Sequence, residues 1–219
     1  MADEIIELKI SAGKANFHVN LNYPTTLKGY DTMRRSILQQ ISHDEDLLKG
    51  EIEADESYFG GKRKGKRGRG AGHKTIVFGI LEREGKVIVS IIPNASADSL
   101  LHETVKKVRR GSIVYTDKWR GYDSLMFCGY KHLNIDHEQK FKQWRVYING
   151  VEGFWSFAKD RLIKHHGISK EKFLLYIKEM EWRYKHKEED LFDLLTRFCW
   201  GLFLYKYLNF WLCRIPQSR

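Results

Sequence analysis

The chain has 219 residues, of which 42% are hydrophobic and 13% aromatic, and this composition predicts a folded protein rather than a disordered one. The formal net charge of +10 argues for a polyanionic partner, either a nucleic acid or an anionic membrane surface. The three cysteines contain no C-x-x-C pair, which argues against a cysteine zinc ribbon and against a disulfide framework.

The first 48 residues carry the weakest pattern of the chain. Residues 4–10 and 16–21 alternate weakly between polar and apolar side chains, as short strands do. Residues 30–41 (YDTMRRSILQQI) have helical spacing. The first ten residues, MADEIIELKI, are acidic, which is unlike the basic start of a secretory signal.

From Gly50 onward, the hydrophobic pattern predicts an α/β domain. Residues 51–59 (EIEADESYF) alternate as a strand does, and residues 75–82 and 86–92 are β-branched runs that a turn joins into a hairpin. A helix, two strands and two helices then follow, at residues 96–108, 112–116, 130–135, 149–164 and 170–186. Either Ser96 or Asp98 is expected to cap the first of these helices. This order is compatible with a mixed sheet that helices cover.

Two further stretches have unusual compositions. Residues 62–74 (KRKGKRGRGAGHK) hold seven Lys or Arg and no acid, which predicts an exposed loop that either lies along DNA or is merely solvated. Its candidate DNA-binding residues are Lys62, Arg63, Lys64, Lys66, Arg67 and Arg69. Residues 198–213 (FCWGLFLYKYLNFWLC) are apolar, but they are short for a membrane span and contain Lys206. We interpret them as a C-terminal helix that packs on its own domain or on a second subunit.

Three acids lie where metal-binding carboxylates are able to converge. Asp55 is in the middle of the first strand of the α/β domain, Asp117 directly follows the strand SIVYT, and Glu152 is in the first turn of a helix. Phosphodiester chemistry by two metals needs such convergence, because two Mg²⁺ ions about 3.5–4 Å apart share ligands. Each acid also has an ordinary alternative, as a solvent-facing strand residue, a turn residue or a first-turn helix acid. Other acids able to replace the second carboxylate are Asp123, Asp136 and Glu138.

The helix expected at residues 149–164 separates polar from apolar positions. At ~100° per residue, the positions that lie within ~60° of Glu152 are Asn149, Ser156, Lys159 and Ile163. A separate apolar face holds Val151, Trp155, Ala158 and Leu162. Lys159 is two turns, or ~10 Å, beyond Glu152. That distance suits a contact with a DNA phosphate beside the metals, although an exposed helix lysine is ordinarily only solvated.

The motifs around these acids resemble the bacterial insertion-sequence transposases that are related to eukaryotic Merlin elements. The resemblance covers roughly residues 47–187 and rests on EIEADESYFGGKRKGKRGRG, SIVYTDKWRGYDSL, NGVEGFWSFAKDRL and HGISKEKFLLYIKEMEWRY, in that order. It implies a ribonuclease H-like mixed sheet flanked by helices, with a catalytic triad at Asp55, Asp117 and Glu152. It also matches Asn149 and Lys159 to positions of the family's pattern, and we expect both residues to bind DNA. The 34 residues between Asp117 and Glu152 are a spacing typical of this class.

The resemblance further implies metal-dependent DNA strand cleavage and strand transfer at transposon ends. Two Mg²⁺ ions, for which Mn²⁺ substitutes, would be held by the triad, with Asp55 bridging both. The expected partners are double-stranded DNA, as terminal inverted repeats and target, and further copies of the chain in a homodimer or higher oligomer. No membrane partner is expected. The expected location is cytoplasmic and nucleoid-associated in a bacterium, or nuclear for a eukaryotic element.

Two rival functions are compatible with the same residues. One is a nuclease of the ribonuclease H fold that cuts without joining, and the other is an inactive DNA-binding remnant of a transposase. The expected domain division is an N-terminal accessory segment at 1–48, a catalytic domain at 49–187 and a helical, apolar tail at 188–219. The N-terminal segment, which has no cysteine, is a candidate remnant of a helix-turn-helix.

Overall fold

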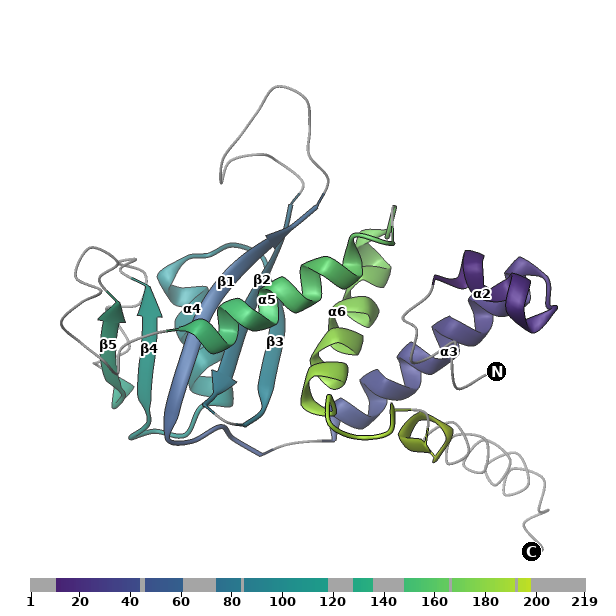
Figure 1. Ribbon diagram of the computed structural model, residues 1–219. Coiled ribbons are helices and arrows are strands. Elements are labelled where there is room, and N and C mark those ends of the chain that lie inside the picture. Colours follow the sequence, from purple (N-terminus) through teal and green to yellow (C-terminus); the bar gives the residue numbers. More distant parts are fainter. Residues whose placement is uncertain are drawn as a thin grey trace, which may run out of the picture. The chain divides into compact units, whose positions relative to one another are not determined.

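The computed structural model describes residues 11–43, 46–60, 74–83, 85–117, 128–135, 148–165, 167–191 and 193–197, without the side chains of residues 18, 19, 134 and 135 (Figure 1). The chain divides into two compact units. One is Glu45–Ile177, and the other combines Met1–Asp44 with Lys178–Arg219. The functional division expected at residues 48 and 187 stays a prediction.

The unit Glu45–Ile177 is built on a five-stranded mixed sheet with the order β3-β2-β1-β4-β5. Its strands are β1 (Glu51–Phe59), β2 (Thr75–Glu82), β3 (Val87–Ile92), β4 (Ile113–Asp117) and β5 (Lys131–Ile135). The strands β1, β2 and β3 form an antiparallel meander, whereas β4 runs parallel to β1 and β5 parallel to β4. This is the ribonuclease H-like arrangement, so the predicted fold class is confirmed, and every expected strand of this unit lies within one residue of its predicted bounds.

One face of the sheet carries the main apolar core. Helix α4 (Ala97–Lys107) contributes Leu100 to this core, and the Ser96 hydroxyl caps the helix by accepting a hydrogen bond from the Ser99 amide at 3.3 Å. Ser96 is therefore the cap, and Asp98 lies in the first turn. The buried residues of this cluster are Leu48, Ile52, Ala54, Phe78, Ile80, Ile92, Leu100, Val108, Val114 and Tyr130. Burial of these side chains supplies the hydrophobic stabilisation of the sheet.

The opposite face of the sheet is covered by helix α5 (Asn149–Leu162) (Figure 1). The ring of Phe59, at the end of β1, lies 6.0 Å from the Trp155 ring of α5 and 5.5 Å from the Phe173 ring at the start of α6 (Lys170–Lys185). The buried face of α5 consists of Val151, Phe154, Trp155, Ala158 and Leu162. The predicted apolar face is therefore confirmed, with Phe154 added to it.

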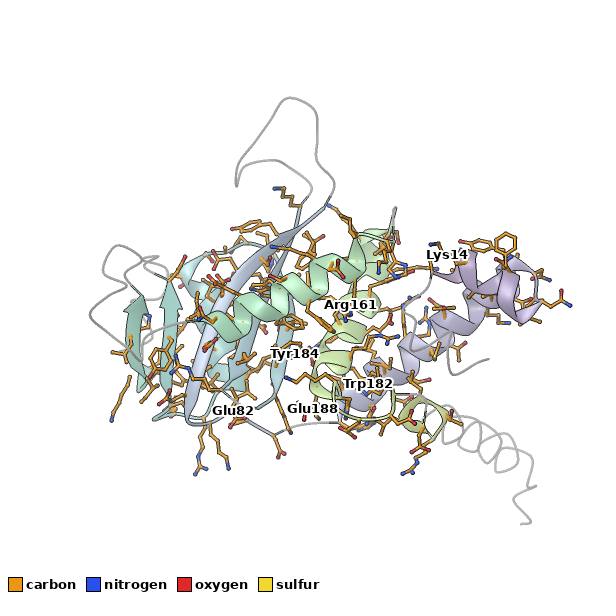
Figure 2. All side chains as sticks on the ribbon, viewed as in Figure 1. Lys14, Glu82, Arg161, Trp182, Tyr184 and Glu188 are labelled. Atoms are coloured by element: carbon orange, nitrogen blue, oxygen red, sulfur yellow. The ribbon has the colours of Figure 1, made fainter. Side chains whose placement is uncertain are left out.

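The second unit is helical in its described part. It contains α2 (Ala12–Val19), α3 (Tyr23–Ser42) and the C-terminal half of α6, and its apolar cluster is Ile37, Trp182 and Leu195 (Figure 2 labels Trp182). The strand expected at residues 16–21 is wrong, because α2 occupies most of that range. Among the side chains described in this helix, the buried ones are Ala12 and Ala15, which are three residues apart. Because both are small, they contribute little to a hydrophobicity pattern.

Charged groups tie α3 to α6 inside this helical unit. The buried Glu179 carboxylate accepts hydrogen bonds from Arg34 Nε at 2.7 Å and from Arg183 Nε at 2.8 Å. Burial would raise the pKa of Glu179, but the two guanidinium groups outweigh it and hold the pKa below its ordinary value. The Trp182 indole N–H donates to Gln40 Oε1 at 3.1 Å. The helix expected at 30–41 thus lies within α3, which begins earlier, after the cap Asn22.

Several predictions fall outside the described residues. These are the strand at residues 4–10, the basic loop residues from Lys62 to Arg69, the alternative acids Asp123, Asp136 and Glu138, and the apolar stretch 198–213. Within the described residues, no helix combines the length and the hydrophobicity needed to cross a membrane.

Candidate active site

Asp55 and Asp117 lie on neighbouring parallel strands of the sheet. The register pairs Glu53 of β1 with Tyr115 of β4, and a step of two residues along each strand leads to Asp55 and Asp117. Because side chains two residues apart share one face of a strand, and parallel neighbours are about 4.8 Å apart, both carboxylates belong to the face that α5 covers. The expected delivery of Asp117 by a parallel strand is confirmed, since it is the last residue of β4.

Asp55 is half-buried beneath α5 and accepts a hydrogen bond from the Trp155 indole. The donor Trp155 Nε1 lies 3.0 Å from Asp55 Oδ2. Burial raises the pKa of Asp55 to about 7, and the negative charges of Glu56 and Asp117 add to this effect, while the hydrogen bonds to the carboxylate oppose it. This side chain therefore lies where negative charge is poorly solvated and where a cation would be strongly favoured.

Glu152 occupies the first turn of α5 and is exposed. Asn149, Ser156 and Lys159 are also exposed, as expected of one polar stripe, and the stripe continues to Ile163, which is 67% exposed. The Lys159 ammonium lies 6.0 Å from the centre of the Phe59 ring, where the end of β1 meets the helix. The stripe thus runs along the exposed side of α5, away from its buried face.

The three acids do not form a complete metal cage by themselves. Within the described part of the chain, no three His, Cys, Asp or Glu side chains lie close enough together to hold a metal ion. Three carboxylates repel one another at short range, as the raised pKa of Asp55 already indicates for two of them. The donor set nevertheless fits Mg²⁺, which is ordinarily bound through one or two carboxylates together with substrate phosphates.

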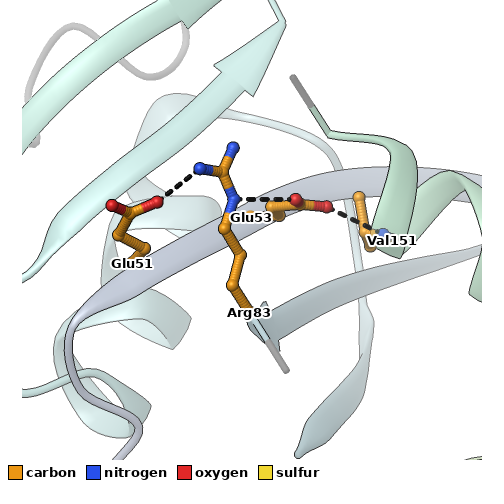
Figure 3. Close-up of polar contacts among 4 residues, drawn as sticks. All are labelled: Glu51, Glu53, Arg83 and Val151. Carbon is orange, nitrogen blue, oxygen red and sulfur yellow. Dashed lines mark hydrogen bonds and ion pairs between the residues drawn. The ribbon is translucent and has the colours of Figure 1, made fainter. Parts of the chain in front are cut away.

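The buried carboxylate of Glu53 is bonded to the start of α5, two residues before Asp55 on β1 (Figure 3). The Glu53 side chain is 1% exposed, and its Oε2 accepts a hydrogen bond from the Val151 amide at 3.0 Å. Its other oxygen, Oε1, accepts from Arg83 Nε at 3.0 Å, and Arg83 Nη1 donates to Glu51. The Arg83 guanidinium also lies 3.9 Å above the Tyr115 ring. Helix α5 is therefore tied to β1 at both Glu53 and Asp55.

The sequence pattern of one family spans this whole arrangement. Residues 47–185 match the ISXO2-like transposase domain, a range that includes all five strands and the three acids. The chain belongs to the ISXO2-like transposase domain family. The resemblance inferred from the motifs is thereby confirmed, and so is a role in DNA transposition at the level of the family.

Two curated relatives carry related descriptions. An uncharacterized transposase-like protein of Haemophilus influenzae is 44% identical over 103 residues, which are 47% of this chain and 84% of the relative. An uncharacterized protein in transposable element ISH50 of Halobacterium salinarum is 26% identical over 199 residues, which are 81% of this chain and 65% of the relative. The chain thus spans just under two thirds of the length of the second relative.

Solved structures with a similar fold include the catalytic core domain of BIV integrase and the Mos1 strand transfer complex. The match to the integrase domain has a TM-score of 0.41 at 14% identity and covers 60% of this chain and 81% of the integrase chain. The match to the Mos1 complex has a TM-score of 0.39 at 13% identity and covers 78% of this chain and 59% of the Mos1 chain.

The contacts around Asp55 and the start of α5 involve residues that the sequence pattern did not single out. Glu53 and Arg83 were not among the expected site residues, and Trp155 was expected only as an apolar anchor. The sequence did contain an indication for Glu53, because it lies two residues before Asp55 and therefore on the same face of β1. A charged side chain at a buried position requires a hydrogen-bonding or charged partner. The identity of that partner, 30 residues away for Arg83 and 98 residues away for Val151, was not readable from the chain order.

Proposed function

We propose that this transposase domain cleaves DNA at transposon ends and joins the freed ends to target DNA, with Asp55, Asp117 and Glu152 as its catalytic carboxylates. The observation that carries the proposal is the placement of two aspartates on neighbouring parallel strands, under a helix whose first turn bears the glutamate. Divalent-metal chemistry on phosphodiesters requires carboxylates that converge from separate elements, and this placement supports the proposal that the three acids supply them once metal and DNA are bound.

Two Mg²⁺ ions, or Mn²⁺ in their place, would be held by the three carboxylates and would supply an activated oxygen nucleophile and stabilisation of the leaving oxygen. Trp155 holds one oxygen of Asp55 in a fixed orientation through its indole N–H. Partial burial under α5 reduces the solvation of that carboxylate and strengthens its attraction for cations. Asn149 and Lys159, exposed on the stripe of α5, would bind the DNA backbone on either side of Glu152.

The basic residues Lys62, Arg63, Lys64, Lys66, Arg67 and Arg69 would extend this DNA contact. They follow directly on β1, whose last residue Phe59 pairs with Thr75 at the start of β2, so both ends of the segment lie at one end of the hairpin. The DNA partners would be the terminal inverted repeats and the target duplex. Synapsis of two transposon ends would bring at least two copies of the chain together, so we propose a homodimer or higher oligomer on DNA.

The test is a Mg²⁺-dependent cleavage and strand-transfer assay on DNA that carries the ends of the element. Asp55→Asn, Asp117→Asn and Glu152→Gln are each expected to lower both reactions by at least about 10³-fold, because an incomplete ligand set cannot hold the ions in place. DNA affinity should be kept or increased, since each change removes a negative charge close to phosphates. Asp160→Asn, an exposed acid on the same helix, is the matched control and should retain activity.

The same assay separates the rival functions. Cleavage without joining would indicate a nuclease of this fold, and DNA binding without either reaction would indicate an inactive remnant. Near wild-type strand transfer by Glu152→Gln in Mg²⁺ would contradict the proposed triad. Lys159→Ala is expected to reduce the rate only partially, as the loss of one phosphate contact does, without changing the metal dependence.

A further inference from the structure

We infer that Glu53 is a positioning residue, whose buried carboxylate fixes the first turn of α5 and thereby sets the place of Glu152 relative to Asp55 and Asp117 (Figure 3). This inference rests on the proposed function. It assigns to Glu53 no contact with DNA or metal, because the side chain is 1% exposed and both of its oxygens accept hydrogen bonds from the protein.

The contact with the helix is specific to its first turn. The first amides of a helix have no partner within the helix, and here the Val151 amide, directly before Glu152, is satisfied by Glu53 Oε2 at 3.0 Å. A carboxylate at this point is also favoured by the positive end of the helix dipole. No side-chain cap is present at Ile148, the residue that precedes the helix, so the acceptor for this turn is supplied by the strand.

Two close contacts between α5 and the sheet restrict the position of the helix. A Cβ added to Gly150 would lie 2.9 Å from Glu53 Oε2 and 3.0 Å from Leu81 Cδ2, so an alanine here would displace the Glu53 carboxylate or the Leu81 side chain. One turn further on, Trp155 donates to Asp55 at 3.0 Å. Glu53 and Asp55 are two residues apart on one face of β1, so the helix is held to the same strand that carries the first catalytic aspartate.

The charge of Glu53 argues for more than packing. A buried ion pair such as that of Glu53 with Arg83 is ordinarily no more stabilising than apolar side chains of the same volume, because both charges lose their hydration. A carboxylate does, however, accept two directional hydrogen bonds at once. One of them orients Arg83 and the other sets the position of the helix, which an apolar residue would leave free to shift.

The decisive variants are Glu53→Gln and Gly150→Ala. Gln keeps the volume of Glu53 but replaces one of its two oxygens by an NH₂ group. In the same orientation, either Arg83 or Val151 therefore meets a donor in place of its acceptor. Ala at position 150 has a higher helix propensity than Gly, so any defect comes from the displaced contact and not from a weaker helix. The matched controls are Glu51→Gln, which changes the exposed end of the same Arg83 network, and Gly153→Ala, whose added Cβ meets nothing within 4 Å.

Three quantities are measured on the full chain. Hydrogen exchange of the α5 N-terminal segment should be at least about 10-fold faster in Glu53→Gln, because a charge-assisted hydrogen bond to the helix is lost. The cleavage rate at saturating DNA should fall about 10- to 100-fold in both decisive variants, as misplacement of a catalytic group does. The DNA concentration for half-maximal rate should change less than about twofold, since binding energy from other contacts is kept.

Each outcome decides the inference. A lower saturating rate with an unchanged half-saturating DNA concentration, restricted to Glu53→Gln and Gly150→Ala, supports it. Wild-type rates in either folded variant overturn it, as does an equal loss in Glu51→Gln. If Glu53→Gln does not fold, Gly150→Ala against Gly153→Ala decides alone. If Glu152→Gln is itself fully active, the proposed triad has failed, and that result is distinct from a failure of Glu53 alone.

Discussion

At the scale of single residues, the electrostatics of Asp55 link the site to the stability of the domain. The pKa of Asp55 is raised from 3.8 to about 7 by burial and by the charges of Glu56 and Asp117. A carboxyl whose pKa is higher in the folded state binds its proton more tightly when folded. Its contribution to stability is therefore fully present below pH 3.8 and is lost as the pH rises towards about 7.

A first prediction follows for Asp55→Asn in the absence of divalent metal. At pH 8, the free energy of unfolding of this variant should exceed that of the wild type by about 2–4 kcal/mol, because the unfavourable buried charge is gone. The difference should shrink steadily between pH 7 and pH 4. Urea unfolding at several pH values, in the presence of a chelator, measures it. An equal gain at pH 5 and pH 8 would contradict the raised pKa.

Addition of Mg²⁺ should narrow this difference in stability at pH 8. A metal that binds only the folded state stabilises it by about 2.7 kcal/mol at a hundred times its dissociation constant. The wild type should gain stability with Mg²⁺, and Asp55→Asn should gain little. Asp160→Asn, which changes an exposed acid on α5, is the control and should respond to Mg²⁺ as the wild type does.

At the scale of elements, the site depends on how closely α5 approaches the sheet. Asp55 of β1 pairs with Gly79 of β2 in the antiparallel register. Because this neighbour has no side chain, the Trp155 indole lies over the backbone of β2, where a Cβ on Gly79 would come within 2.5 Å of its ring. The absence of a side chain at Gly79 therefore permits the hydrogen bond from Trp155 to Asp55.

We therefore predict that Gly79→Ala destabilises the domain by about 1–3 kcal/mol, the usual result of overpacking a filled core. The indole should also be displaced from Asp55, so the saturating cleavage rate should fall with the stability. Trp155→Phe, which lacks the N–H but fills most of the same space, should lose rate with a smaller loss of stability. Urea unfolding and the cleavage assay measure the two effects. A fully stable Gly79→Ala would contradict the packing seen here.

At the scale of the whole molecule, the net charge of +10 is concentrated in one segment of the chain. Seven of the 38 Lys and Arg residues lie within residues 62–74, which contain no acid. In the chain, this segment comes between β1, the strand that carries Asp55, and β2. Under the proposed function, this charge would attract a polyanion that the carboxylates would otherwise repel.

The matching prediction concerns the salt dependence of DNA binding. Replacement of Lys62, Arg63, Lys64, Lys66, Arg67 and Arg69 by Gln should weaken binding and reduce the slope of log affinity against log salt concentration by up to roughly five, at ~0.9 per phosphate contact. Fluorescence anisotropy with duplex DNA at several salt concentrations measures the slope. An unchanged slope would assign this charge to solvation and not to DNA contact.

The sequence by itself determined the local elements and the family. Alternation in residues 51–59, the β-branched runs that follow and the helical spacing of residues 149–164 all appear at the expected places, because each is a periodicity within one segment. The motifs around Asp55, Asp117 and Glu152 were sufficient to identify a transposase domain. Among the described elements, the exception is the strand predicted at residues 16–21, where α2 lies; the buried side chains described in this helix are Ala12 and Ala15, which give a weak hydrophobic period.

Only the tertiary structure decided which residues hold the site together. The bonds from Val151 to Glu53 and from Trp155 to Asp55 join positions 98 and 100 residues apart, and nothing in the local pattern of either segment encodes such a pair. The glycines at 79 and 150 likewise matter because of what lies opposite them in space. Periodicity reports which face of an element is buried, whereas the partner on that face is set by strand order, register and the path of the chain between them.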